Sequence, residues 1–414
     1  MEPPPDSQPA CLKAAGWLLA AFLFVLPFSS SAALRNAFLG LAVLALACAG
    51  AKGGLARPRF PPWRVLVPML AYGAWCAASV AWSVDPAYSR GELRPGLLYP
   101  LIAFLAFFAA TASLEAIDRW AWSLAAGLAG LGIMAVAEVV LHGWWDPQRW
   151  HGDVGFYATH VVLAMPLLAW AFLRSAPGAL FARAALAASA LLTLLATSWN
   201  DNRIAWIALA AMTVLAVFLL RERLAGPWRA WILGGTAAAV LAFAALFLLA
   251  IEQRAERLQG TEFAEEAQLA HDPRPALWDY AAKRHGEAPW AGFGYGRDIL
   301  RLEFRTGVTP GVDNPRHTHA HNTPVNVLLQ GGLVGLALFA WMVEALVREI
   351  TAGLRAGTSR KFAAVLGLTL VAGFAIRNMT DDFLVRHNAL LAWSLAGAVL
   401  GALRGAATSA RTPA

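Results

Sequence analysis

The residue types best suited to chemistry occur at 317–335, where three histidines at alternate positions precede an apolar segment punctuated by glycine. Thr323 is a suitable N-cap for a helix, and Pro324 suits its first position, where the missing N–H costs nothing. His321 would then lie just before a helix N-terminus, whose partial positive charge disfavours a protonated imidazole and favours an anionic ligand. We therefore predict a neutral histidine that acts as a base beside a phosphate. A polar cap at a membrane surface is the alternative.

Two arginines are expected at the starts of helices, where a positive side chain opposes the helix dipole. Arg203 follows the polar turn 199–202 and opens an apolar segment, and Arg274 follows Asp272 by two positions. A side chain that opposes a local rule is often kept for function, and the planar fork of arginine suits a phosphate or pyrophosphate. Salt bridges from Arg203 to Asp201 and from Arg274 to Asp272 are the alternative.

The elements that would hold these side chains are membrane helices. The chain is 58% hydrophobic and 14% charged, with 18 Trp, which is the composition of a polytopic membrane protein. We therefore predict an all-α polytopic membrane protein with twelve transmembrane helices, a single integral-membrane domain over residues 1–414. The first apolar run lacks the features of a cleaved signal peptide. Apolar runs of spanning length fall near 14–32, 33–51, 64–82, 96–113, 118–141, 155–174, 178–198, 203–220, 229–251, 324–347, 361–379 and 387–405.

The short loops predict how these helices are oriented. If the N-terminus is cytoplasmic, seventeen lysines and arginines fall in the inside loops and tails, and only seven fall in the short outside loops. Both termini are therefore predicted to be cytoplasmic, and the net charge of +7 reflects topology, not binding to nucleic acid. Cys11, Cys48 and Cys76 fall in the cytoplasmic tail or inside spans, so no disulfide is expected.

One connection, residues 252–323 between the ninth and tenth spans, is far longer than the others and is predicted to be a large periplasmic loop. Its aromatic content argues against disorder. Asp272 and Pro273 predict the start of a helix that runs to about His285, with Leu277, Tyr280 and Ala281 on one face. A second helix at roughly 297–305 would align Arg297, Arg301 and Arg305. Both are expected to be amphipathic helices at the membrane interface.

Weaker candidates lie near the outer ends of the predicted spans. Glu138 and His160 are ionisable groups within spans, which makes them functional candidates, although a structural hydrogen bond between them is an equal alternative. Asp381 and Asp382, between the last two spans, could ligate a cation or pair with the arginines at 377 and 386. Pairing is the favoured interpretation.

The sequence gives little support for a metal or a nucleotide. His317 and His319 could bind zinc together with His321, but no nearby cysteine or well-spaced carboxylate completes such a site. The alternating glycines at 292, 294 and 296 do not join a strand to a helix, so a flexible turn is favoured over dinucleotide binding. No Asp-x-Asp motif is present to hold a nucleotide sugar through a metal. We predict no cofactor.

These motifs together resemble the signature of bacterial O-antigen ligases. His321-Asn322 is followed, after nine residues, by Gly332-Leu333-Val334-Gly335. Arg203, which opens a span after a polar turn, is similar to the first functional arginine of that family. Arg274 and Trp278, followed by Pro289 and then Gly292-Phe293-Gly294, resemble the pattern in the family's large periplasmic loop. The resemblance covers the twelve-span plan and roughly residues 195–390.

The resemblance implies a glycosyltransferase of the bacterial inner membrane that acts at the periplasmic face. Such an enzyme moves a polysaccharide from undecaprenyl pyrophosphate to a sugar hydroxyl of lipid A–core, without nucleotide or metal. His321 would be the catalytic base, and Arg203 and Arg274 would bind the pyrophosphate. Arg297, Arg301 and Arg305 would hold phosphates of lipopolysaccharide or anchor the loop to lipid headgroups. Possible supporting residues are Asn322, Trp278, Glu138, His160 and Asp381.

Alternatives remain open within and outside this superfamily. An O-antigen polymerase or a protein-glycosylating oligosaccharyltransferase would share the histidine and glycine signature. A secondary transporter of twelve spans belongs to a different class, but transporters place ionisable groups and broken helices near the bilayer midplane. Here the unusual residues gather at the outer ends of the spans, which disfavours a transporter.

Overall fold

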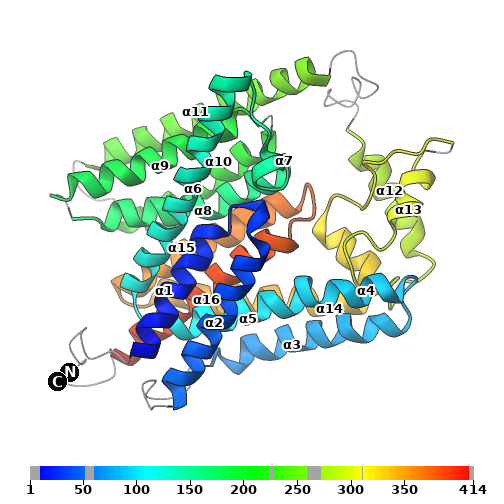
Figure 1. Ribbon diagram of the computed structural model, residues 1–414, viewed down its shortest axis with the longest axis horizontal. Coiled ribbons are helices and arrows are strands. Elements are labelled where there is room, and N and C mark those ends of the chain that lie inside the picture. Colours follow the sequence, from blue (N-terminus) through cyan, green and yellow to red (C-terminus); the bar gives the residue numbers. More distant parts are fainter. Residues whose placement is uncertain are drawn as a thin grey trace.

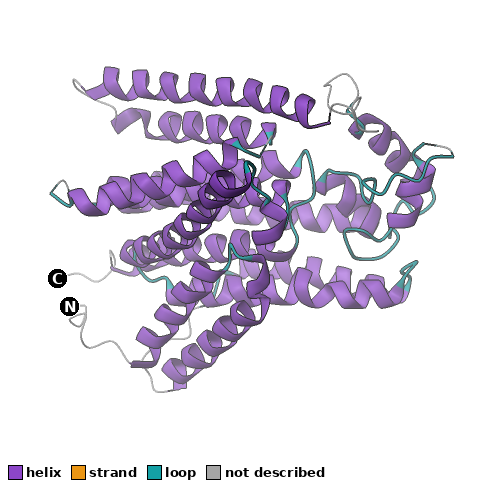
Figure 2. Cartoon of the chain, turned by 45° about the horizontal axis from the view of Figure 1, so that its top comes forward, coloured by secondary structure: helices purple, strands orange, loops and turns teal. Residues whose placement is uncertain are grey.

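The computed structural model describes residues 10–51, 60–176, 178–200, 202–223, 228–258, 272–309 and 311–409. These residues form helices and connecting turns, with no strand among them (Figure 2). The helices are α1 (Ala10–Val25), α2 (Ala32–Ala51), α3 (Trp63–Ala78), α4 (Pro86–Leu93), α5 (Tyr99–Ala110), α6 (Leu114–His142), α7 (Pro147–Trp150), α8 (Val154–Arg174), α9 (Leu180–Ser198), α10 (Arg203–Leu220), α11 (Trp228–Leu258), α12 (Arg274–His285), α13 (Arg301–Gly307), α14 (Thr323–Ala352), α15 (Thr358–Asn378) and α16 (Arg386–Ser409).

Ten helical segments in the described residues are long and apolar enough to cross a membrane. The all-helical membrane architecture predicted from composition is thereby confirmed. Each of the twelve predicted spans overlaps a helix, but α1 is a shorter apolar helix of 16 residues and α16 is not among the ten. The total of twelve spans therefore stays a prediction, as does the orientation of the chain in the membrane.

The long helices lie roughly side by side, with α9, α10 and α11 along the top of Figure 1 and α3, α5 and α14 along the bottom. Helix α16 packs closely on α5 because small residues face it. A Cβ atom at Gly397 or Gly401 would collide with the backbone carbonyl of Phe104 or Phe108. Small residues of this kind let membrane helices approach closely. This packing fixes the turn between α15 and α16, which carries part of the candidate site.

The first turns of α1 and the last turns of α16 lie at the end of the bundle opposite α12 and α13 (Figure 1). Helix α12 begins at Arg274, one residue later than predicted, and buries Leu277 and Ala281 as expected. Helix α13 begins at Arg301, so the prediction of a helix from 297 was wrong. Arg297 lies in a turn before it, where its half-buried side chain pairs with Asp298 and is not aligned with Arg301 and Arg305.

Helix α14 is interrupted at Gly332, whose backbone has φ 63° and ψ −165°. Residues 289–294 of the large loop lie against this break, and a Cβ atom at Gly292 would meet the carbonyl oxygen of Leu329 at 2.5 Å. The turn predicted here is therefore bonded to α14 on both sides of the break, which satisfies polar backbone groups that the break would leave without partners. The backbone N–H groups of Phe293, Gly294, Leu333 and Val334 donate to the carbonyls of Leu329 (2.8 Å), Gln330 (3.0 Å), Pro289 (2.8 Å) and Trp290 (3.3 Å) respectively.

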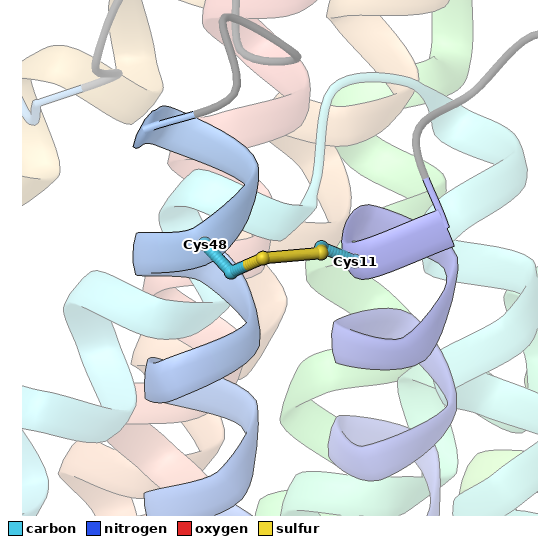
Figure 3. The surroundings of a disulfide bond; sticks show 2 residues. All are labelled: Cys11 and Cys48. Atoms are coloured by element: carbon cyan, nitrogen blue, oxygen red, sulfur yellow. A yellow bond between two sulfur atoms is a disulfide. The ribbon is translucent and has the colours of Figure 1, made fainter.

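A disulfide joins Cys11 to Cys48, with 6.2 Å between the two Cα atoms (Figure 3). The expectation of no disulfide was therefore wrong. Helices α1 and α2 form a hairpin, which brings together two residues that are 37 positions apart in the chain. Sequence patterns do not show such a pairing. Cys76 is a free, buried thiol.

The predicted orientation can be tested by thiol labelling in a variant whose three native cysteines are replaced by serine. Leu302 on α13 and Gly357, just before α15, are exposed positions that the predicted topology puts on opposite sides of the membrane, and each is replaced by cysteine in turn. A membrane-impermeant maleimide added to spheroplasts should label the first and spare the second. Gly357→Cys should react only after the membrane is permeabilised, because the loop that carries it is predicted to be cytoplasmic.

Labelling of both positions from the same side would contradict this topology. The Cys11–Cys48 pair offers an independent check in cells, because thiols that face the cytoplasm are kept reduced. A Cys11–Cys48 bond that survives rapid alkylation of growing cells would place that end of the bundle in the periplasm and reverse the orientation.

Candidate functional site

His321 lies directly before α14 in a left-handed backbone conformation, with φ 48°. This conformation is uncommon for residues other than glycine and is concentrated at functional sites. Its ring atom Nδ1 lies 3.1 Å from Oδ1 of Asp381, and Nε2 lies 3.3 Å from the backbone oxygen of Arg316. The placement of His321 at a helix N-terminus is thus confirmed. Its neutral charge state stays a prediction.

The cap of this helix is Asn322, not Thr323 as predicted. The Asn322 side chain accepts a hydrogen bond from the backbone N–H of Val325 at 3.1 Å and donates one to the carbonyl of Met379 at 3.0 Å. Thr323 instead donates through its hydroxyl to Asn378 at 2.6 Å and Asp382 at 2.9 Å. These bonds join the start of α14 to the turn between α15 and α16, and so fix the position of His321 relative to Asp381.

Asp381 lies between two histidines. Nε2 of His319 is 2.8 Å from the same carboxylate oxygen that contacts His321, and the two imidazole centroids are 4.1 Å apart. Nδ1 of His319 lies 3.4 Å from Oδ1 of Asp298. Burial alone would lower the pKa of His319, but its bonds with Asp298 and Asp381 raise it. Burial would raise the pKa of Asp381, but His321 and His319 lower it well below its usual value.

The predicted pairing of the two aspartates with arginine was wrong. In the described residues, Asp381 contacts histidines, and Asp382 is buried and accepts hydrogen bonds from Thr323 and from Asn326 at 2.9 Å. Asn326 also accepts from the backbone N–H of residue 320 at 3.0 Å. Sequence reasoning missed Asn326, and it considered His319 only as part of a disfavoured zinc site. The position of Asn326, one turn after Asn322 on the same helix face, was the available signal.

Helix α12 contacts the site on both sides. Arg274 donates through Nε to the backbone oxygen of Thr380 at 2.9 Å, and Trp278 donates through Nε1 to the backbone oxygen of Ala320 at 2.9 Å. These two acceptors immediately precede Asp381 and His321. A spacing of four residues puts Arg274 and Trp278 on the same face of the helix, so that both side chains can reach the backbone beside Asp381 and His321. Arg274 also pairs with Asp272 at 2.6 Å, as the structural alternative predicted.

Arg203 is the first residue of α10, as predicted. The preceding residue, Asn202, accepts a hydrogen bond of 2.7 Å from Nη1 of Arg377. Arg377 is buried and also donates to Oγ1 of Thr159 at 2.9 Å and to the backbone oxygen of Gly155 at 3.1 Å. It therefore ties α8 and the start of α10 to the end of α15. The alternative pairing of Arg203 with residue 201 involves a position outside the described residues.

Residues 188–340 match the family model described as O-antigen ligase. This segment is similar to O-antigen ligases. It contains Arg203, Arg274, His321 and the Gly332–Gly335 motif, so the resemblance drawn from these residues is confirmed. Asp381 lies beyond the matched segment.

A curated relative supports the same conclusion over a longer stretch. The chain is 29% identical over 341 residues to an O-antigen ligase of Pseudomonas aeruginosa, an alignment that covers 78% of this chain and 75% of the relative. The similarity to O-antigen ligases points to glycosyltransferase-type activity, and the apolar helices indicate a multi-pass membrane protein.

Two cavities share part of their lining near the site. The first, of about 540 Å³, has an apolar wall that includes Met69, Leu97 and Trp393 and a polar wall that includes Arg297 and Asp382. The second, of about 270 Å³, lies between α14, α15 and α16 and is almost wholly apolar. Both are lined by Thr323, which stands two residues after His321. Apolar space from within the bundle therefore extends to Thr323, at the start of α14.

Glu138 and His160 do not bond to each other, so the structural hydrogen bond that stood as the alternative for this pair was wrong. Glu138 accepts from the indole N–H of Trp150 at 2.7 Å and pairs with Arg149 at 3.3 Å. Among the described residues, neither ring nitrogen of His160 has a hydrogen-bond partner. Its ring centroid lies 5.0 Å from that of His151. Tertiary packing separates the two side chains although their predicted spans are adjacent.

Proposed function

We propose that this protein is an O-antigen ligase of lipopolysaccharide biosynthesis. It transfers a polysaccharide en bloc from undecaprenyl pyrophosphate to a sugar hydroxyl of lipid A–core, at the periplasmic face of the inner membrane. The observation that carries the proposal is the His321–Asp381 pair, 3.1 Å apart, with Arg274 bonded to the backbone one residue before Asp381. A candidate base, the group that orients it and a cationic side chain thus lie together at one helix terminus.

His321 is the proposed general base. Its Nδ1–H donates to Asp381, which orients the ring and leaves Nε2 to receive a proton. The acceptor hydroxyl displaces the contact between Nε2 and the backbone oxygen of Arg316. As the hydroxyl oxygen bonds to the anomeric carbon of the donor sugar, its proton passes to Nε2. The bond from that carbon to the pyrophosphate oxygen breaks, and undecaprenyl pyrophosphate leaves.

The two arginines stabilise the leaving group. A planar guanidinium can donate two parallel hydrogen bonds to a phosphate. Because Arg203 is the first residue of α10, the backbone N–H groups at the start of that helix can also donate to the phosphate. Negative charge that develops on the pyrophosphate is met by fixed positive charge, so the proposed reaction needs neither nucleotide nor metal. The two cavities that meet at Thr323 supply apolar space for hydrocarbon chains of the lipid substrates.

The lipopolysaccharide of a deletion strain tests this function against the polymerase alternative. Loss of a ligase should leave bare lipid A–core on a gel, together with long polymer still attached to its lipid carrier. Loss of a polymerase should instead leave core that carries one repeat unit. The gene for the intact chain should restore the ladder in the deletion strain, and the His321→Ala gene should not. Core that carries one repeat unit in the deletion strain would reject the ligase assignment.

A further inference from the structure

Three side chains of the site present one metal-ligating atom each to a common point. The ligating atoms of His319, His321 and Asp381 all lie within 4.8 Å of one another. The two imidazole nitrogens that face the carboxylate are 2.8 and 3.1 Å from its Oδ1 atom. The sequence offered three histidines in one loop but no suitable carboxylate. The fold supplies the carboxylate from a turn some sixty residues later, and it leaves His317 out of the group.

The outer nitrogens of both histidines face hydrogen-bond acceptors. Nδ1 of His319 lies 3.4 Å from Asp298 and 2.8 Å from the hydroxyl of Thr318, and Nε2 of His321 lies 3.3 Å from the backbone oxygen of Arg316. A histidine that binds a metal almost always donates its other N–H to a carboxylate or a backbone carbonyl. In the tautomer that carries the hydrogen on both outer nitrogens, both inner lone pairs point at the same carboxylate oxygen. A positive species between these three atoms stabilises that arrangement.

We propose that His319, His321 and Asp381 bind a zinc-class divalent cation, and that this cation inhibits the protein. Two imidazoles and one carboxylate, with a fourth position open to water, form a ligand set typical of Zn²⁺. Mg²⁺ and Ca²⁺ prefer oxygen ligands and are disfavoured here. The side chains of His321 and Asp381 are 25% and 26% exposed, so an ion can reach the site from the aqueous phase.

The inhibitory part of this inference rests on the proposed function, whereas the binding part does not. A cation on Nδ1 of His321 keeps the hydrogen on Nε2, where it donates to the backbone oxygen of Arg316. That nitrogen can then no longer accept a proton from an acceptor hydroxyl. The cation also takes Asp381 from its role of orienting the ring. One bound ion therefore removes both parts of the proposed base.

Binding is tested on the purified full-length protein after removal of metals with a chelator. Calorimetric titration with ZnCl₂ should show one site, and His319→Gln, His321→Gln and Asp381→Asn should each weaken it by about tenfold or more. His317→Gln is the matched control and should bind zinc like the wild type, because His317 lies outside the group of ligating atoms. Absence of zinc binding by the wild type, or equal weakening in His317→Gln, would overturn the site.

Transfer assays separate this inference from the proposed function. Zinc should inhibit the wild type reversibly, and EDTA should restore the rate. His319→Gln should keep a measurable fraction of the metal-free rate and should lose sensitivity to zinc. Zinc that binds as expected to a protein without transferase activity would sustain the site but reject the function. If the protein transfers glycan but neither binds zinc nor is affected by it, the function stands and the zinc site is rejected. If transfer requires zinc, the inhibitory role of the cation is overturned.

Discussion

Replacement of His321 by alanine should abolish transfer of glycan from a carrier-linked donor to purified lipid A–core, measured with chelator present. General-base catalysis contributes about 10²–10⁴-fold to rates, so the residual rate should fall to about 1% of the wild-type rate or below. The fold should survive, because the bonds that join α14 to the α15–α16 turn come from Asn322, Thr323 and Asn326. Thermal unfolding in detergent should therefore remain close to that of the wild type.

The neighbouring histidines are the controls for this result. His317→Ala and His319→Ala should each retain a measurable fraction of activity, because neither imidazole is the proposed base. His319 contacts Asp381 and is a positioning residue, so His319→Ala should lower the rate of transfer more than His317→Ala does. Equal loss in all three variants, or loss of wild-type activity on chelation, would favour an essential metal site and defeat the general-base assignment.

The arginine variants should show the second large effect. Arg203→Ala and Arg274→Ala should each lower the rate of transfer by about 10²–10³-fold, the usual effect of removing one group that stabilises charge in a transition state. Lysine should rescue poorly at either position, because a point charge cannot reproduce two parallel hydrogen bonds to a pyrophosphate. The measurement is the same in vitro transfer, at saturating acceptor, with expression and unfolding temperature checked for each variant.

Arg348→Ala provides a matched loss of positive charge far from the site. Arg348 is exposed near the end of α14 and pairs with Glu344. This variant should transfer at the wild-type rate. If the Arg203→Lys and Arg274→Lys proteins kept near-normal activity, the proposed role of the two arginines in holding pyrophosphate would have to be abandoned.

The parts of this site that are local in sequence could be predicted, and the parts made by tertiary contact could not. A helix start after His321 follows from Thr323 and Pro324, although Asn322 is the residue that caps it. Both Asn and Thr are good caps, so composition alone could not decide between adjacent positions. The spacing of Arg274 and Trp278 placed both on one helix face, but not the backbone groups that they contact.

Asp381 illustrates what lies beyond sequence patterns. Nearby arginines made an ion pair the simplest expectation, whereas the packing of α14 against α15 brings two histidines to the carboxylate instead. Arg297 shows the effect of a helix boundary. Because α13 begins at 301 and not at 297, Arg297 lies in a turn, where it is half-buried and donates to the backbone oxygen of Asp382 at 3.3 Å. A shift of four residues in one boundary thus placed this cation, expected on an interfacial helix, in a half-buried position beside Asp382.

The break in α14 at Gly332 has a consequence for protein engineering. Four backbone hydrogen bonds connect residues 289–294 to positions on both sides of the break, so this part of the loop and the first turns of the helix move as one piece. A chimera that exchanges only residues 252–323 between relatives would separate the two halves of this unit. Grafts intended to alter acceptor choice should instead carry residues 272–335 together, with the joins placed in α14 beyond Gly335 and ahead of α12.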